Sequence, residues 1–323
     1  MSVPTGTYLR YDVVGDREDL QDVIFNISPV QTPFLSGLGR GKCDSTLHEW
    51  QTDELSAADP DNAQLEGDDT TFSTPSPTVR VGNYTQISRK EVVVSGTLER
   101  IKKAGRKSEL AYQTAKRGKE LKRDMESGLL ENQGGVGGSA GVARRYASMG
   151  AWLKTNTDFD DTTGEDPTYT EGVPGAARTD SSAVRALTET IAKGVIQSAW
   201  AEGGEPNVIM VGPFNKQRIS EDFAGIASHT VNVDRPGATH VAAAVDIYAS
   251  DFGNLRIVPN RFQRERDAWF LDFSLLRLKT LRPMFRERLA KTGDNQKWHL
   301  IVEYTLEVGN EAGLGGAFDL ESS

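Results

Sequence analysis

The stretch that decides the fold is ELAYQTAKRGKELKRDMESGLL, residues Glu109 to Leu130. In and just before it, apolar or small residues recur at steps of three and four residues or their multiples, as on one face of a helix. They are Leu98, Ile101, Ala104, Ala111, Ala115, Gly118, Leu121, Met125 and Leu129. Gly105 interrupts the pattern and Ser108 is suited to cap the main part. We expect a helix of about 24 residues, roughly 36 Å long, which is unusual in globular proteins.

The glycine-rich stretch after this helix contains GGSAG at positions 137–141, a match to the G-x-S-x-G motif of serine hydrolases. That motif requires a strand before the serine and a helix after it, because this sharp turn exposes the hydroxyl. Here a helix comes first and a loop follows. A hydrolase that uses Ser139 with His229 or His240 is therefore the weaker hypothesis. No phosphate-binding G-x-x-x-x-G-K-[ST] motif occurs in the chain.

Upstream of the helix, the pattern predicts a long two-stranded extension. Thr46–Thr52 alternates like a strand, and strand patterns return from Val79 to Val94. Residues 56–78 between them are acidic, poor in apolar residues and contain proline, as in a protruding loop. The first 40 or so residues have short apolar groups between breakers, so we expect an arm that orders by lying on another surface. A ribbon and an arm of this kind need support.

Downstream, we expect a compact α/β unit and then long strands. A helix is predicted from Ser182 to Glu202, with Val184 and Leu187 on its apolar face and Gly203-Gly204 ending it. A short buried strand covers Asn207–Pro213, and a helix follows from Asn215 to Phe223. The closing strands are expected at 269–271, 275–281 and 297–308. In the last of them every second residue is apolar, so we expect one buried face, with Trp298 in a core between strand and helix.

Composition excludes several classes of protein. The 323 residues carry a net charge of −9, which argues against a free nucleic-acid-binding domain. The single cysteine, Cys43, allows no intramolecular disulfide, and neither the histidines nor the acidic clusters have metal-ligand spacing. No apolar run is long enough to span a membrane, so we expect a soluble protein made in the cytoplasm. We predict no catalytic residues, no metal and no cofactor.

One segment is basic within this acidic chain. From Thr97 to Glu126 there are ten Lys or Arg against five Asp or Glu. The simpler interpretation is a solvated helix face with i, i+4 ion pairs, for example at Glu120 and Asp124. The more specific interpretation is that this face contacts acidic neighbours or packaged nucleic acid.

The order of these parts resembles the major capsid proteins of tailed bacteriophages with the Hong Kong 97 fold, in particular the podovirus SU10-like family. The resemblance covers nearly the whole chain. It is carried by ISPVQTPFLSGLGRGK (27–42), LHEWQTDEL (47–55) with the following EGDD, KEVVVSGTLERIKKAG (90–105), the helix stretch itself and LAKTGDNQKWHLIVEYTLEVGNEA (289–312).

The resemblance implies an α+β fold with five parts. These would be an N-terminal arm (1–44), an extended β-loop (45–96), a first part of the peripheral domain (97–205) with a spine helix at about 106–131, an axial domain (206–266) and a second part of the peripheral domain (267–323).

The resemblance also implies a function. The chain would form hexamers and pentamers of an icosahedral virion shell around double-stranded DNA, assembled in the host bacterial cytoplasm. Its partners would include a portal, separate scaffold or decoration proteins, and DNA bound without sequence preference. We hypothesise that acidic residues of the loop meet basic residues of a neighbouring subunit. The residues concerned are Asp53, Glu54, Glu66, Asp68, Asp69, Arg100, Lys102, Lys103, Arg106 and Lys107. An encapsulin-like compartment, which shares the fold but encloses protein cargo, is the other alternative.

Overall fold

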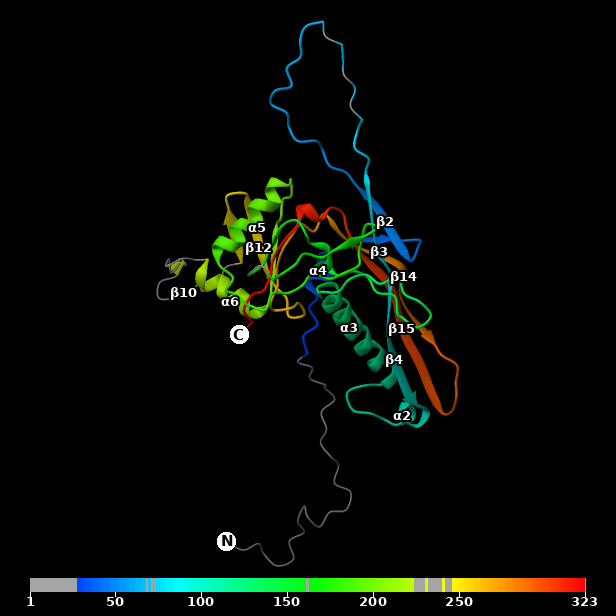
Figure 1. The fold of residues 1–323 in the computed structure, drawn as a ribbon. Helices are drawn as coiled ribbons and strands as arrows, with labels where there is room; N and C mark the ends of the chain where they lie inside the picture. The colour runs from blue at the N-terminus through cyan, green and yellow to red at the C-terminus, as the bar shows by residue number, and fades with distance from the viewer. Residues whose placement is uncertain are drawn as a thin grey trace, which may run out of the picture.

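The computed structural model describes residues 28–67, 69–70, 72, 74–160, 163–223, 230–231, 240–241 and 246–322 (Figure 1). The helices are α1 (Pro33–Gly37), α2 (Gly96–Arg100), α3 (Glu109–Leu129), α4 (Met149–Trp152), α5 (Glu189–Ala201), α6 (Pro213–Asp222) and the short 3-10 helix η2 (Glu311–Gly313). The strands are β1 (Gly39–Lys42), β2 (Leu47–Thr52), β3 (Val79–Tyr84), β4 (Gln86–Ser95), β5 (Thr157–Asp158), β6 (Tyr169–Thr170), β7 (Val173–Pro174), β8 (Val208–Val211), β9 (Thr230–Val231), β10 (His240–Val241), β11 (Ile247–Ser250), β12 (Gly253–Pro259), β13 (Ala268–Leu271), β14 (Leu276–Arg288), β15 (Asn295–Val308) and β16 (Gly315–Ala317).

Two sheets organise the body of the molecule. A four-stranded sheet has the order β1-β14-β15-β4 and lies beside α3 in the lower right of Figure 1. Its long strands pair antiparallel, and β1 adds in parallel to β14. A six-stranded sheet has the order β11-β12-β8-β13-β16-β5, and its apolar side chains pack with those of α5 and α6. The chain thus has an elongated lobe built on α3 and a more compact α/β lobe.

The long helix confirms the main prediction. It begins after Ser108, whose hydroxyl accepts a hydrogen bond from the Ala111 amide, and Gly105 interrupts the preceding segment with a φ of 72°. Leu121, Met125 and other apolar residues of its inner face are buried in the largest core cluster, which includes residues of β15. Packing against strands, rather than propensity alone, stabilises a helix that carries so many charges.

The second helix begins later than predicted, at Glu189 rather than near Ser182. Thr188 caps it, and the segment before the cap is extended because Arg185 exchanges backbone hydrogen bonds with Asp319 and Glu321. Val184 is consequently 50% exposed instead of lying on a buried helix face. The predicted end is correct, since Gly203 adopts a φ of 87° after the last turn.

The alternating pattern of the last long strand predicts that only one of its faces is buried. In the structure, both faces of its second half are buried. From Val302 to Val308 both faces of β15 are buried, including Glu303 and Glu307. Trp298 is only partly buried, and the Arg286 guanidinium lies 4.5 Å from the centroid of its ring. The prediction that Trp298 belongs to the core is therefore wrong. The buried tryptophans of the core are Trp152 and Trp269.

The described part of the arm packs on its own chain. Phe34 and Leu35 are buried, and their amides donate to the two carboxylate oxygens of Glu126 on α3 at 2.8 and 2.6 Å. Asn260 donates to the same carboxylate at 2.7 Å. Burial raises the pKa of Glu126 despite these three hydrogen bonds. Residues 28–42 are thus supported within the chain, and residues 1–27 lie outside the described residues.

Candidate interaction surfaces

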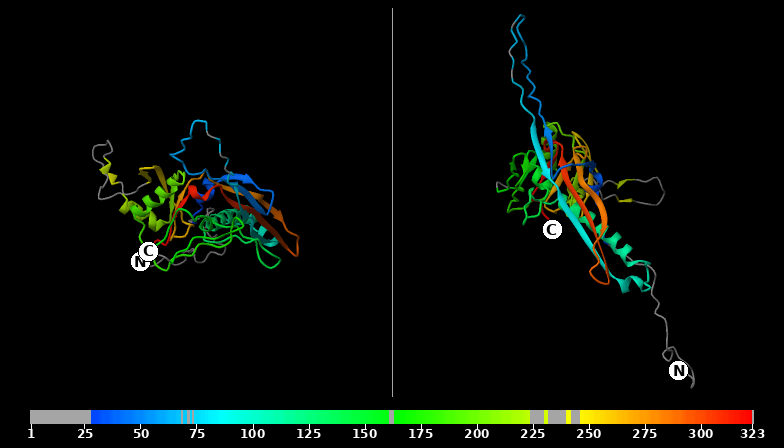
Figure 2. Two further views of the ribbon diagram at one scale, coloured as in Figure 1. Left: turned by 45° about the horizontal axis from the view of Figure 1, so that its top comes forward. Right: turned by 90° about the vertical axis from the view of Figure 1, so that its right-hand side faces the viewer.

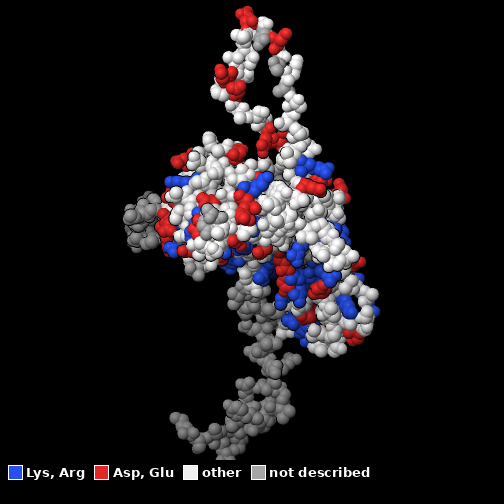
Figure 3. Space-filling view, viewed as in Figure 1, with Lys and Arg blue, Asp and Glu red and all other residues white. Residues whose placement is uncertain are grey.

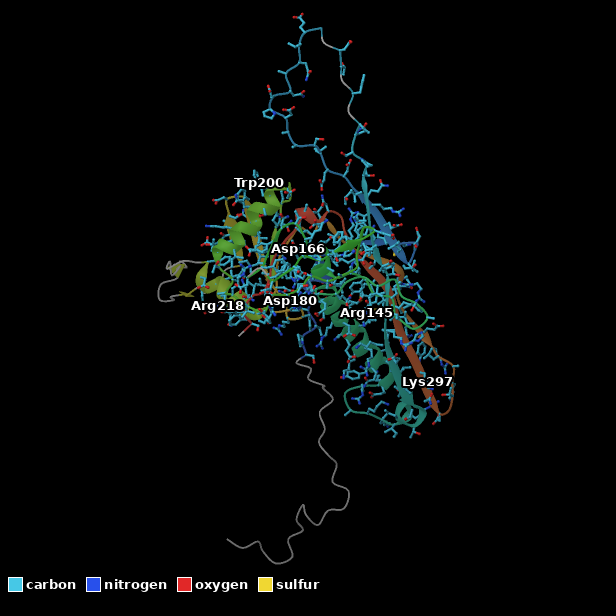
Figure 4. All side chains as sticks on the ribbon, viewed as in Figure 1. Arg145, Asp166, Asp180, Trp200, Arg218 and Lys297 are labelled. Atoms are coloured by element: carbon cyan, nitrogen blue, oxygen red, sulfur yellow. The ribbon has the colours of Figure 1, made fainter. Side chains whose placement is uncertain are left out.

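A loop projects from the end of the β2–β3 ribbon (Figures 1 and 2). The two strands pair antiparallel from Leu47 with Tyr84 to Thr52 with Val79, and residues 53–78 connect them without strand or helix in their described part. Its apolar side chains lie in the open: Leu55 is 99% exposed, Leu65 80% and Phe72 91%. Figure 4 shows no other described part of the chain beside the outer loop. The described part of the chain therefore leaves these three apolar side chains uncovered.

The base of the ribbon, in contrast, is bound to the body. The Asn83 side chain is fully buried, donates to the carbonyls of Ala147 and Leu306 at 3.0 and 2.8 Å, and accepts from the Ala147 amide at 2.7 Å. Trp50 of β2 packs on Trp152 with ring centroids 5.3 Å apart. These contacts set the direction in which the loop leaves the body.

Two buried glutamates of β15 strengthen this base. Glu307 accepts from His48 Nε2 at 2.6 Å and pairs with Lys279 Nζ at 3.0 Å. Glu303 accepts from Thr85 at 3.1 Å and from Arg282 at 2.7 Å, and it also pairs with Arg144. Burial raises the pKa of Glu307, but the hydrogen bonds from His48 and Lys279 outweigh it and hold that pKa below its ordinary value.

This anchoring cluster was not predicted from the amino-acid sequence. The signal in the sequence was that Glu303 and Glu307 both lie on the polar side of a strand whose other side is apolar. Its meaning depends on basic and histidine partners from distant parts of the chain, which the pattern of one strand does not contain.

The acidic residues predicted as interface residues lie in the projecting loop. Asp53, Glu54, Glu66 and Asp69 are all exposed. Asp68 lies outside the described residues. The loop therefore presents negative charge together with exposed apolar side chains.

The predicted basic residues fall into two groups. Arg100, Lys102 and Lys107 are exposed, and none of them has an ion-pair partner in the part of the chain that the structure describes. Lys103 instead donates to the carbonyls of Leu98, Glu99 and Ile101 around the end of α2.

Arg106 pairs with Glu109 and lies over the ring of Tyr112, 5.3 Å from its centroid. Like Lys103, it stabilises its own segment. Only the first group, Arg100, Lys102 and Lys107, is thus available to a neighbour.

The acidic and basic groups do not meet within one chain. In Figure 1 and in the right-hand view of Figure 2, the loop extends from one end of the molecule, whereas α2 and the segment after it lie toward the other end. In Figure 3 the outer loop carries red and no blue, whereas on the lower lobe blue lies among red. Any attraction between these groups must therefore act between copies.

The geometry at Ser139 differs from that of a nucleophile elbow. Ser139 is exposed and its backbone pairs with Val142 in a tight turn, with no strand leading into it and no helix leaving it. His229 lies outside the described residues, as does the side chain of His240. Within the described residues, no group of three or more His, Cys, Asp or Glu could hold a metal ion. Cys43 is free and buried, and burial raises the pKa of its thiol.

The ion pairs on the surface of α3 differ from the predicted i, i+4 pairs. Glu120 pairs with Arg117, three residues earlier, at 2.6 Å, and Asp124 pairs with Lys90 of β4 at 2.6 Å. The helix surface is therefore bound partly to itself and partly to the neighbouring sheet.

No helix in the described part of the chain is both long enough and apolar enough to cross a membrane.

Comparison with known proteins identifies relatives of this architecture. The family model of the SU10 major capsid protein matches residues 3–321. The major capsid protein of Escherichia phage Phieco32 is 28% identical, with 98% of each chain covered. The capsid asymmetric unit of cyanophage A-1(L) superimposes with a TM-score of 0.68 at 12% identity, covering 97% of this chain and 99% of that chain.

An encapsulin shell protein is a more distant structural neighbour. The holo-SrpI encapsulin complex from Synechococcus elongatus PCC 7942 gives a TM-score of 0.53 at 8% identity, over 95% of this chain and 92% of that chain. At these identities the structural comparisons establish the fold, which is the Hong Kong 97 type of phage capsids. The encapsulin alternative is not favoured over the phage capsid interpretation.

Proposed function

This chain belongs to the SU10 major capsid protein family, and from that premise we propose how its surfaces act in the shell. A major capsid protein of a phage forms an icosahedral shell, so each copy meets several neighbours. We propose that the projecting loop of one subunit binds Arg100, Lys102 and Lys107 of the next subunit through its acidic residues, while its exposed apolar side chains pack on the neighbour's surface.

The separation of charge along the molecule carries this proposal. Complementary patches at opposite ends of one chain favour head-to-tail contacts, which generate closed rings when the rotation between copies closes. An exposed ion pair contributes only about 0.2–1 kcal/mol. A shell repeats the contact in every subunit, so modest pairs add up over many copies.

The division of labour follows the family resemblance. We propose that residues 1–44 act as the arm, 45–96 as the extended loop, 97–205 with 267–323 as the peripheral domain, and 206–266 as the axial domain at the hexamer and pentamer axes. We further propose that the shell assembles in the host cytoplasm with a portal and separate scaffold or decoration proteins, and encloses double-stranded DNA. The chain's role is structural, with no catalytic step assigned to it.

A charge-reversal experiment tests the loop contact. The triple variant Arg100→Glu, Lys102→Glu and Lys107→Glu should strongly reduce the yield of particles in electron microscopy and size-exclusion chromatography. These residues are better targets than Lys103 and Arg106, whose loss would also disturb α2 and the start of α3. The matched control exchanges Arg100→Lys, Lys102→Arg and Lys107→Arg, which preserves charge and should preserve yield.

Rescue separates a contact from a folding defect. Adding Asp53→Lys, Glu54→Lys and Glu66→Lys to the triple variant restores opposite charges and should recover particles. Wild-type yield from the triple variant alone would contradict the proposed contact. The ratio of absorbance at 260 and 280 nm of the purified particles reports whether they enclose nucleic acid.

A further inference from the structure

One buried carboxylate joins three separate parts of the chain. Glu126 lies on α3 and is fully buried, and the described start of the arm lies beside this helix (Figure 1). The carboxylate Oε1 accepts from the Phe34 amide at 2.8 Å and from the Asn260 side chain at 2.7 Å. Its Oε2 accepts from the Leu35 amide at 2.6 Å. Asn260 directly follows β12 of the six-stranded sheet, so the three donors come from the arm and from the α/β lobe.

No positive charge balances this carboxylate. The other acidic side chains nearby on and after α3 have basic partners, since Asp124 pairs with Lys90 and Glu131 with Arg264. Glu126 has no such partner among the described residues, and only its three N–H donors act against the rise in pKa that burial causes. A buried charge is tolerated when it is paired or hydrogen-bonded. The stability of this site therefore depends on donors that the arm and the α/β lobe supply.

The donor from the α/β lobe is held in position by its own surroundings. The Asn260 amide donates to the Val211 carbonyl at 2.8 Å, and the Asn260 side-chain oxygen accepts from the Phe262 amide at 2.9 Å. The Phe262 ring also lies under the Arg123 guanidinium of α3, 5.2 Å from the ring centroid. Residues 260–262 thus hold the α/β lobe against α3, at a contact that we call the joint.

The arm supplies the other two donors from α1. The side chains of Phe34 and Leu35 are buried in the core cluster that also contains residues of α3, and the Phe34 ring centroid lies 6.0 Å from that of Phe273. These contacts hold the two amides against the carboxylate. If the arm left α3, two of the three donors would leave with it, and the buried charge would keep one neutral side-chain amide.

We propose that Glu126 couples the docking of the arm to the docking of the α/β lobe, so that the arm acts as a latch on the joint. With the arm in place, all three donors satisfy the carboxylate. When the arm detaches, the charge no longer stays buried, because Asn260 alone does not compensate for its desolvation. The carboxylate then turns toward water, which separates Asn260 from α3 and loosens the joint. This inference goes beyond the proposed loop contact and does not depend on it.

Hydrogen exchange in the unassembled full-length subunit, followed by mass spectrometry, tests the coupling. Asn260→Ala removes the donor of the α/β lobe and should accelerate exchange at the amides of Phe34 and Leu35 several-fold. The matched control is Gln263→Ala, at another buried amide side chain of the same segment. Gln263 donates to the Asp267 carbonyl instead of to the buried carboxylate, so its loss should leave exchange in the arm unchanged.

The opposite direction must show the same coupling, because coupling between two sites is reciprocal. Phe34→Ala weakens the docking of the arm and should accelerate exchange at the amides of Asn260 and Phe262 several-fold. The internal reference is the Gly82 amide, which donates to the Gly172 carbonyl in the ribbon and should keep its exchange rate. Equal acceleration at Gly82 would report global unfolding, in which case the milder Phe34→Leu provides the same comparison.

A Glu126→Gln background separates coupling through the charge from simple proximity. The neutral side chain leaves no buried charge behind when the arm detaches, so Phe34→Ala should then have little effect on exchange at the joint. An arm that exchanges at the wild-type rate in Asn260→Ala, or that responds equally to Gln263→Ala, would overturn the proposal. An unchanged response of the joint to Phe34→Ala in the Glu126→Gln background would also overturn it.

Discussion

At its base the β2–β3 ribbon is held by a fully buried asparagine, two buried glutamates and stacked tryptophans, whereas the loop at its outer end exposes its apolar and acidic side chains. Buried polar networks of this kind favour one arrangement, because any departure leaves hydrogen-bonding groups unpaired. The base is thus positioned by the chain itself. Under the proposed contact, the loop is covered only when another copy is present, which suits a subunit that has to fold first and assemble afterwards.

Removing Trp152 should break the base most severely. The Trp152→Ala substitution removes the ring on which Trp50 packs. It also removes the edge-on contact with Tyr169, whose ring centroid lies 5.7 Å from that of Trp152. Loss of a fully buried tryptophan typically costs about 3–5 kcal/mol. Urea-induced unfolding of the unassembled subunit, followed by circular dichroism, measures this cost.

The matched control for that prediction is Trp298→Ala, at the partly buried position on β15. We expect it to lower the free energy of unfolding by less than about 2 kcal/mol. Equal costs for the two substitutions would contradict the distinction between the anchored base and the outer surface of the sheet.

A smaller effect is expected from the charge of Glu307. Its lowered pKa means that the folded state favours the carboxylate. This contribution is fully present above the unfolded-state pKa of about 4.3 and disappears as the pH falls through the folded-state value. Glu307→Gln should therefore cost about 1.5–3 kcal/mol at pH 7, as expected for hydrogen bonds to a charged group.

The cost of Glu307→Gln should shrink as the pH is lowered below about 4. Urea unfolding of both proteins between pH 3.5 and 7 gives this difference directly. Glu91→Gln is the control, since the Glu91 side chain is 56% exposed in a surface pair with Arg89. A pH-independent difference between wild type and Glu307→Gln would show that the carboxylate is not held by His48 and Lys279.

The accuracy of the sequence predictions depended on how local the determining contacts are. The helix α3 and its cap at Ser108 follow from residues within a few turns, so periodicity and capping chemistry predicted them. The start of α5 did not follow, because Val184 and Leu187 have helical spacing while the backbone of Arg185 pairs with the end of the chain. Such a tertiary contact overrides a local pattern.

The same distinction applies to the interaction surfaces. The exposed acidic loop was predictable from composition, since an apolar-poor segment cannot bury itself. In contrast, composition could not predict that Lys102 is exposed while Lys103 donates to three carbonyls. Both are adjacent lysines, and only the path of the chain after α2 decides which of them reaches the carbonyls.

Substitutions in the loop should have the smallest effect on the stability of the subunit. They also test most directly the contrast between the anchored base of the ribbon and its exposed loop. Leu65→Ser and Phe72→Ser remove apolar side chains that are 80% and 91% exposed. Because these side chains are not buried in the subunit, the free energy of unfolding should change by no more than about 0.5 kcal/mol. If they pack on a neighbour, particle yield should nevertheless fall, since burying apolar surface drives association. Size-exclusion chromatography and electron microscopy of the stable variants give that yield. A double variant that assembles as well as the wild type would mean that the apolar side chains of the loop do not contribute to the contact, and would leave its charged residues to hold the neighbour.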